Sequence, residues 1–173
     1  MQRLLAVLAV GRRCAETGTA FGEGAAAIAS TAASLVTVER DEERAAAARD
    51  RLREFENVEL HVGDWREVLP ERAPFDLLFF DAGRLDESPD VVDLLTVGGL
   101  LVKDDLTPAR SIDGDPIREL LFRHSQLVCV EILTTPQTAA IVGAKLEPRG
   151  TNRRSASSAK AIVIGTMTMP SCV

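Results

Sequence analysis

The sequence predicts an α/β fold in which a mostly parallel sheet carries helices on both faces. Short apolar runs alternate with helical patterns along the chain, as in strands joined by crossover helices. The run FDLLFFDA is continuously apolar, which suits a strand in the middle of a parallel sheet. The last two apolar runs, LVCVEIL and TAAIVGA, are joined by TTPQ. Because this connection is too short for a parallel crossover, these strands should pair antiparallel.

The first half of the chain is predicted to contain three strands, each followed by a helical segment. Leu4–Val10 is a short helix or a buried piece of one, and RRCAE leads into the first strand. A glycine-rich loop follows, then an alanine-rich helix at Ala25–Ala33. The second strand, SLVTVE, ends at Glu39, and the helix DEERAAAARDRLREF has Asp41 as its candidate N-cap. VELHVGD is the third strand, and WREVLPE is a short helical turn.

The second half is predicted to complete the sheet. FDLLFFDA ends at Asp81, DVVDLL forms a helix, VGG forms a turn, and LLVKDD is the next strand. DPIRELLFRH is a helix before the closing hairpin. We therefore expect residues 1–146 to form one domain. Residues 147–173 are polar and predict a flexible tail, in which AIVIGTMTM could form a strand.

Composition narrows the possible partners and the compartment. The formal net charge of -6 argues against nucleic acid or an anionic membrane as a partner. The 3 cysteines are far apart and predict neither a disulfide framework nor a zinc site, which favours a reducing, cytoplasmic location. The run LLAVLAV is too short to span a bilayer, and GRR rather than a small-residue cleavage site follows it.

Polar or glycine-rich residues follow four successive predicted strands. They are the glycine loop, Glu39, the GDW stretch at 63–65 and Asp81. In a parallel sheet these strand ends share one edge, where ligands of α/β proteins bind. Each stretch alone could be a loop without a function, but their recurrence predicts a ligand site.

The nature of the ligand follows from Glu39 and the glycine loop. Glu39 lies about 20 residues beyond that loop, where an acid can hydrogen-bond a ribose. The glycines at 18, 22 and 24 do not fit the dinucleotide pattern G-x-G-x-x-G, which disfavours a nicotinamide dehydrogenase, and no phosphate-binding P-loop is present. Glu16 would repel a pyrophosphate but would suit an ammonium group.

The stretches AETGTAFGEG, VTVERD, VGDWREVLP, FDLLFFDA and GGLLVKDDL together resemble the class I S-adenosylmethionine-dependent methyltransferases. Within this class they are most similar to the small-molecule O-methyltransferases of the catechol and caffeoyl-CoA type. The resemblance extends from Arg12 to Ala144 and implies a Rossmann-like methyltransferase fold, a seven-stranded sheet with an antiparallel last strand.

The resemblance assigns cofactor roles by position. Glu16, Gly18, Thr19 and Gly24 would surround the methionine part, and Glu39 would hold the ribose. Asp64 would meet the adenine amino group, and Trp65 would either stack on the base or serve only as a packing residue. The full set implied for S-adenosylmethionine is Glu16, Gly18, Thr19, Gly22, Gly24, Glu39, Asp64, Trp65 and Asp81.

The resemblance also implies a reaction, transfer of the methyl group to an oxygen of a small hydroxylated, catechol-like molecule. A divalent cation such as Mg²⁺ would assist it, with Asp81, Asp104 and Asp105 in the ligand positions. Asp104 and Asp105 could instead be solvated turn residues. The implied catalytic residues are Asp81, Lys103 and Arg84, and Lys103 can be a base only if its pKa is lowered.

Three departures from the family pattern leave a second function open. The chain has DAGR where the family has D-A-D-K, and Arg84 is a poor base because it stays protonated. Asp105 takes the place of an amide. The chain begins almost at the first strand, so most of the usual amino-terminal lid helices are missing, or a partner subunit of a homodimer supplies the lid. The alternative function is a methyltransferase-like domain that binds the cofactor with lost or altered catalysis.

Overall fold

A computed structural model describes residues 1–82, 84, 85 and 88–148 of the chain. The predicted tail lies outside the described residues from 149 onward, as does its candidate strand AIVIGTMTM. The elements, in chain order, are α1 (Gln2–Ala9), β1 (Arg13–Thr17), α2 (Glu23–Ala29), β2 (Ser34–Glu39), α3 (Glu42–Leu52), β3 (Val58–Val62), α4 (Trp65–Val68), β4 (Phe75–Phe80), the 3₁₀ helix η2 (Pro89–Leu94), β5 (Leu95–Leu106), α5 (Pro116–Arg123), β6 (Leu127–Leu133) and β7 (Ala139–Lys145).

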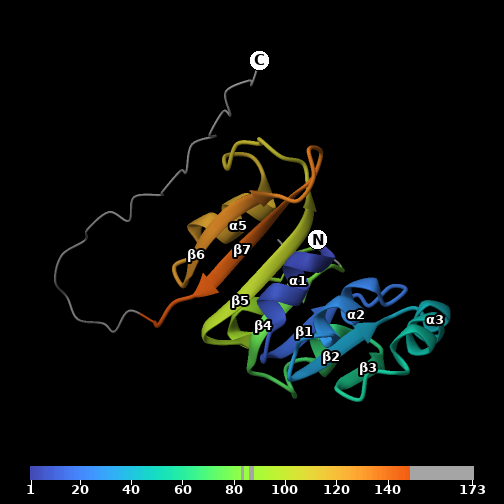
Figure 1. The fold of residues 1–173 in the computed structure, drawn as a ribbon. Coiled ribbons are helices and arrows are strands. Elements are labelled where there is room, and N and C mark those ends of the chain that lie inside the picture. The colour runs from blue at the N-terminus through green and yellow to red at the C-terminus, as the bar shows by residue number, and fades with distance from the viewer. Residues whose placement is uncertain (83, 86–87, 149–173) are drawn as a thin grey trace.

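The strands form one seven-stranded sheet in the order β3-β2-β1-β4-β5-β7-β6 (Figure 1). Neighbouring strands from β3 to β5 pair in parallel, whereas β7 pairs antiparallel with both β5 and β6. The order reverses at β1 and β4, which lie side by side although β2 and β3 separate them in the chain. The predicted sheet and its antiparallel last strand are confirmed.

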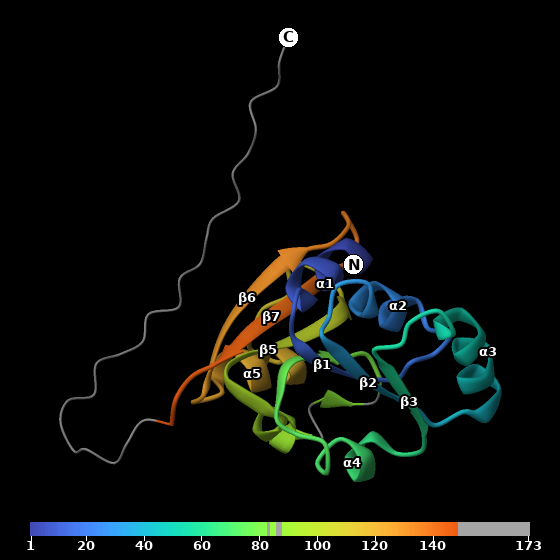
Figure 2. The same cartoon turned by 60° about the horizontal axis from the view of Figure 1, so that its bottom comes forward.

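Helices cover both faces of the sheet, as predicted. α1, α2 and α3 lie on one face, and α4 and α5 lie on the other (Figures 1 and 2). Val91 and Val92 of η2 pack into the same core as α4 and α5. Alternation along β4 supplies both cores, because Leu77 and Phe79 pack with the first group and Leu78 and Phe80 with the second. Since β4 is buried on both faces, its continuous apolar sequence is explained.

Side-chain caps set where several helices begin. Asp41 accepts a hydrogen bond from the backbone N–H of Arg44 at 2.9 Å, so it caps α3 as predicted. Asp115 caps α5 in the same way through the N–H of Arg118, at 3.1 Å. Each cap satisfies a backbone donor that the helix leaves unpaired and contributes about 1 kcal/mol.

The segment before β5 differs from the prediction in two respects. The expected helix DVVDLL is a 3₁₀ helix, Pro89–Leu94, and the expected VGG turn lies inside β5. Gly98 has φ +80°, and the pairing of β4 with β5 shifts register between Phe75 and Leu77. The glycines therefore serve an irregularity within the strand rather than a chain reversal.

Candidate cofactor site at the carboxyl edge of the sheet

The loop after β1 needs glycine because other segments approach it closely. A Cβ on Gly18 would lie 2.3 Å from Cβ of Ala82, the second residue after β4, and Gly18 has φ +78°. A Cβ on Gly24 would lie 2.5 Å from Oε1 of Glu16 and 3.1 Å from Cε1 of Phe79. Both positions exclude any larger side chain without a rearrangement of the site.

Glu16 is held at the end of β1 by a buried chain of hydroxyls. Its side chain is 1% exposed, and Oε2 accepts a hydrogen bond from Oγ1 of Thr37 at 2.6 Å. Oγ1 of Thr37 is also 2.6 Å from Oγ1 of Thr19. Burial raises the pKa of Glu16 to about 8; the Thr37 hydrogen bond opposes the rise, while the charges of Asp81 and Glu39 add to it.

Glu39 joins the end of β2 to the glycine loop. Its Oε2 accepts a hydrogen bond from the N–H of Ala20 at 2.7 Å. Its Oε1 accepts from the N–H of Arg40 at 2.9 Å and of Asp41 at 3.0 Å. Ala20 has φ +48°, a left-handed conformation that costs a non-glycine residue about 1 kcal/mol or more. The structure tolerates it where the loop meets this carboxylate.

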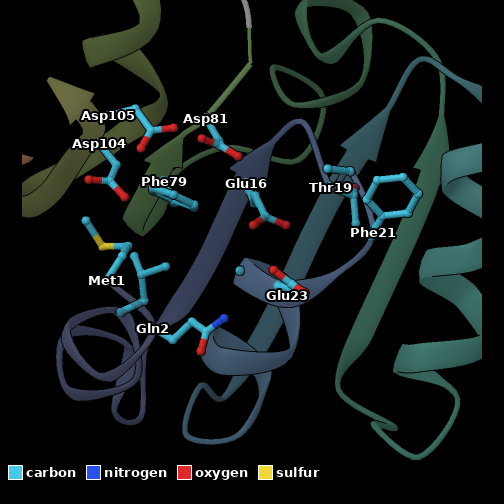
Figure 3. Close-up of a pocket in the computed structure, with 13 residues that line it drawn as sticks. Met1, Gln2, Glu16, Thr19, Phe21, Glu23, Phe79, Asp81, Asp104 and Asp105 are labelled. Atoms are coloured by element: carbon cyan, nitrogen blue, oxygen red, sulfur yellow. The ribbon is translucent and has the colours of Figure 1, made fainter. Parts of the chain in front are cut away.

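Two cavities flank the glycine loop. The first, which we call the acidic cavity, has a volume of about 210 Å³ (Figure 3). It is lined by Met1, Gln2, Leu5, Glu16, Thr19, Ala20, Phe21, Glu23, Gly24, Phe79, Asp81, Asp104 and Asp105. The second, which we call the β2 cavity, has a volume of about 120 Å³. It is lined by Gly18, Val38, Glu39, Arg40, Gly63, Asp64, Trp65, Arg66 and Ala82.

The β2 cavity contains an aromatic wall and an ion pair. Trp65 is 8% exposed and packs edge-on against Phe80, with ring centroids 5.4 Å apart, so it is both a packing residue and a cavity wall. Asp64 pairs with Arg40 at 2.6 Å. The backbone N–H of Arg66 and the Arg40 guanidinium hold the pKa of Asp64 below its usual range. An adenine amino group would therefore compete with Arg40 for Asp64.

Three aspartates line the acidic cavity near the ends of β4 and β5, namely Asp81, Asp104 and Asp105 (Figure 3). Asp81 is exposed as a residue, but partial burial of its carboxyl raises its pKa; Lys103 opposes this rise, while Asp105 and Asp104 add to it. Asp104 is 8% exposed, and its Oδ1 is buried without a hydrogen-bond partner among the described residues. Lys103, also 8% exposed, lies on β5 next to Asp104.

The predicted Mg²⁺ site at Asp81, Asp104 and Asp105 finds no support in the structure. In the part of the chain that is described, no group of three or more His, Cys, Asp or Glu side chains could hold a metal ion. The three carboxylates share one cavity, and Asp105 adopts φ +59° at a register shift between β5 and β7. This shift places Asp105 outside the regular alternation of the strand.

A third cavity, of about 340 Å³, lies beside the acidic cavity and shares Asp105 with it. Arg84, one of the predicted catalytic residues, lines this third cavity rather than the acidic cavity. The cavity is lined by Arg84, Asp105, Leu106, Thr107, Arg110, Gly114, Asp115, Pro116, Ile117 and Arg118.

A buried ion network fixes one wall of the third cavity. Arg118 is 1% exposed and donates to Glu131 through Nε and Nη2, both at 2.8 Å. It also donates to Asp115 at 2.6 Å and to the carbonyl of Thr107 at 2.8 Å. These bonds attach the segment between β5 and α5 to β6.

The structure places most of the predicted cofactor residues around the first two cavities. Gly22 is the exception, because it lines none of the three cavities described. It has φ +82°, precedes α2, and packs against Ala48 and Arg51 of α3. The left-handed backbone and the nearby α3 therefore explain the glycine at this position.

Sequence reasoning missed Thr37, Ala20 and Arg40. Thr37 could have been found, because alternation along β2 places it on the same face as Glu39. Arg40 directly follows Glu39, but its partner Asp64 is distant in the chain. Nothing in the sequence singles out Ala20.

The class of protein follows from this fold and from a family comparison. A seven-stranded sheet with an antiparallel β7 and a glycine loop at its order reversal defines the Rossmann-like methyltransferase fold. Residues 15–106 match a family described as a methyltransferase domain. The chain belongs to this family, as a class I S-adenosylmethionine-dependent methyltransferase domain.

Among individual proteins, the chain is similar to protein methyltransferases. The chain is 35% identical over 126 residues to a protein-L-isoaspartate O-methyltransferase of Burkholderia pseudomallei. That alignment covers 70% of this chain and 38% of the relative, so the chain spans well under half of that protein's length. The predicted resemblance to the catechol type is therefore supported only at the level of the methyltransferase class.

Solved structures agree on the fold. A methyltransferase from Geobacter sulfurreducens superposes with a TM-score of 0.70 at 20% identity, covering 84% of this chain and 77% of that one. An O-methyltransferase from Bacillus cereus in complex with SAH gives a TM-score of 0.64 at 21% identity, covering 83% of this chain and 78% of that one. No helix among the described residues is long and apolar enough to cross a membrane.

Proposed function

We propose that this chain binds S-adenosylmethionine across the glycine loop and transfers its methyl group to an oxygen of an acceptor. The observation that carries the proposal is the pair of cavities on either side of Gly18–Ala20, one containing Glu39 and the other Glu16. The glycines at 18 and 24 let Ala82, Glu16 and Phe79 approach the loop closely, and these contacts shape the two cavities.

In this arrangement the nucleoside lies in the β2 cavity and the methionine part in the acidic cavity. Glu39 is the acid available to a ribose, and Trp65 provides an apolar surface for a base. Glu16 is available to the ammonium group of the amino acid end, and the aspartates line the part of the same cavity that meets the third cavity at Asp105. When bound, S-adenosylmethionine supplies a methyl group activated by a positively charged sulfur.

The third cavity is the proposed acceptor site. Its volume lies in the range of small-molecule sites, and its wall is fixed by the Arg118 network. Asp105 lines both this cavity and the acidic cavity, so it is placed to orient an acceptor hydroxyl and to take its proton. Arg84 and Arg110, which also line it, can orient an acceptor but are poor bases.

A small hydroxylated, catechol-like molecule is the first candidate acceptor, since the third cavity is large enough to hold one. A second candidate is an isoaspartyl carboxylate in a protein or peptide, which the name of the 35% identical relatives suggests. The two acceptors differ in whether they need a base from the protein. A carboxylate acceptor is already deprotonated at neutral pH and needs none, whereas a hydroxyl must lose its proton.

Cofactor binding is tested by calorimetry with S-adenosylmethionine and, separately, NAD. Glu39→Gln should weaken S-adenosylmethionine binding at least tenfold, because the amide cannot accept hydrogen bonds at both of its terminal atoms. Glu43→Gln, an exposed position on α3, is the matched control and should bind normally. Equal affinities for the two variants would refute the ribose assignment, and binding of NAD alone would refute the cofactor.

Transfer is then tested with labelled S-adenosylmethionine on catechol and on an isoaspartyl peptide, each with magnesium and with a chelator. Asp105→Asn should reduce transfer to the catechol more than to the peptide. Turnover that falls with the chelator would restore the magnesium hypothesis. Cofactor binding without transfer to any acceptor would favour the alternative of a binding domain with altered catalysis.

A further inference from the structure

Acidic groups outnumber cations in the acidic cavity. Its lining includes five carboxyl groups, those of Glu16, Glu23, Asp81, Asp104 and Asp105. Burial raises the pKa of Glu16 to about 8 and keeps it largely protonated near neutral pH. Among the described lining residues one cation faces these groups, the amino terminus of Met1, whose charge acts on Asp104. In Figure 3 the carboxylates of Glu16 and Asp81 lie at neighbouring strand ends, with Asp104 and Asp105 on the next strand. A cavity of this composition attracts a positively charged ligand.

Burial removes two of these carboxyl groups from water, whereas Asp81 and Asp105 are exposed. Glu16 is 1% exposed and Asp104 is 8% exposed, so both carboxyls are largely removed from solvent. Oδ1 of Asp104 has no hydrogen-bond partner among the described residues. A buried acceptor without a partner is costly and indicates a group missing from the protein alone. Lys103 opposes the charge of Asp81 but is not among the lining residues.

We propose that the acidic cavity recognises the positive charge of the cofactor sulfur, so that the protein binds S-adenosylmethionine more tightly than its product S-adenosylhomocysteine. The specificity-determining residues are Asp81, Asp104 and Asp105, which gather at the ends of β4 and β5. This inference rests on the proposed function, since it concerns the same ligand in the same cavity.

The two ligands differ in one methyl group and one unit of charge. Their ammonium and carboxylate groups are identical, so their difference in affinity reports mainly on the sulfur. At an effective dielectric constant of about 20, one carboxylate a few ångströms from a sulfonium favours the charged ligand by roughly tenfold or more. Loss of that charge on methyl transfer should therefore weaken binding of the product relative to the substrate.

A bound divalent cation is the competing explanation for the same aspartates. The described residues contain no group of three or more potential ligands with suitable geometry, which favours the organic cation. The glycine loop and Glu16 extend the same cavity toward the proposed nucleoside position, and a metal ion alone would leave that part unexplained.

The test is calorimetry in buffer with a chelator, using S-adenosylmethionine, S-adenosylhomocysteine and sinefungin, an analogue with an amine-bearing carbon in place of the sulfur. The protein, Asp104→Asn and Asp50→Asn are compared. Asp104→Asn keeps the shape of the side chain and removes its charge. Asp50→Asn removes one charge at an exposed position on α3, outside the cavity, and controls for net charge.

We expect S-adenosylmethionine and sinefungin to bind at least tenfold more tightly than S-adenosylhomocysteine. In Asp104→Asn this ratio should fall at least threefold, mainly through weaker binding of the two cations, whereas Asp50→Asn should preserve it. Equal affinity for S-adenosylmethionine and S-adenosylhomocysteine would overturn the inference while leaving the proposed cofactor intact. Absence of binding by all three ligands would instead overturn the proposed function.

Discussion

Gly18→Ala tests the close approach on which the cofactor site depends. The added Cβ would lie 2.3 Å from Cβ of Ala82, at a residue with φ +78°. The left-handed backbone costs an alanine about 1–2 kcal/mol. Overpacking against a neighbour that cannot move costs about 1–3 kcal/mol more. Ala82 is restrained because its N–H donates to the carbonyl of Thr17 at 2.9 Å.

We therefore expect Gly18→Ala to lower the free energy of unfolding by about 2–5 kcal/mol. Gly98→Ala is the matched control, since Gly98 has φ +80° but nothing within 4 Å of an added Cβ. It should lose only the backbone contribution, about 1–2 kcal/mol. The double variant Gly18→Ala/Ala82→Gly removes the clash and should recover part of the loss.

Urea unfolding measures these differences, with the fluorescence of Trp65 as the probe because it is the only tryptophan and is 8% exposed. Calorimetry with S-adenosylhomocysteine gives the effect on the site. If Gly18→Ala and Gly98→Ala unfold at the same urea concentration, the loop after β4 does not constrain Gly18, and the argument for a glycine-lined ligand site fails.

Two further predictions concern buried charges. Burial raises the pKa of Glu16 from 4.5 to about 8, so between these pH values the folded chain keeps a proton that the unfolded chain releases. The free energy of unfolding of the ligand-free protein should therefore fall as pH rises through this interval. In Glu16→Gln it should fall less steeply. Urea midpoints measured across pH would contradict this if both proteins showed the same slope. Arg118→Met leaves the carboxylates of Glu131 and Asp115 without their shared partner and should cost about 3–5 kcal/mol. Arg118→Met/Glu131→Met should cost less, and an Arg118→Met protein as stable as the parent would show that the network contributes nothing.

Much of the fold could be predicted because it depends on local pattern. The alternation of strands and helices, the double-sided burial of β4 and the short TTPQ connection each report on a few adjacent residues. The same holds for Glu39 as the acid at the end of β2 and for Asp41 as a cap. The turn predicted before β5 is wrong because adjacent glycines, here Gly98 and Gly99, occur at irregularities inside strands as well as at turns.

The sequence by itself determined the class of sheet and the edge at which most of the candidate cofactor residues gather. Only the tertiary structure decided which groups those side chains contact. Ala82 meets Gly18, Thr37 binds Glu16 and Glu131 pairs with Arg118, all across segments far apart in the chain. Oδ1 of Asp104, which finds no hydrogen-bond partner in the described part of the chain, likewise depends on what surrounds it. Such contacts arise from the way strands register and cross, and residue patterns along one strand carry no information about them.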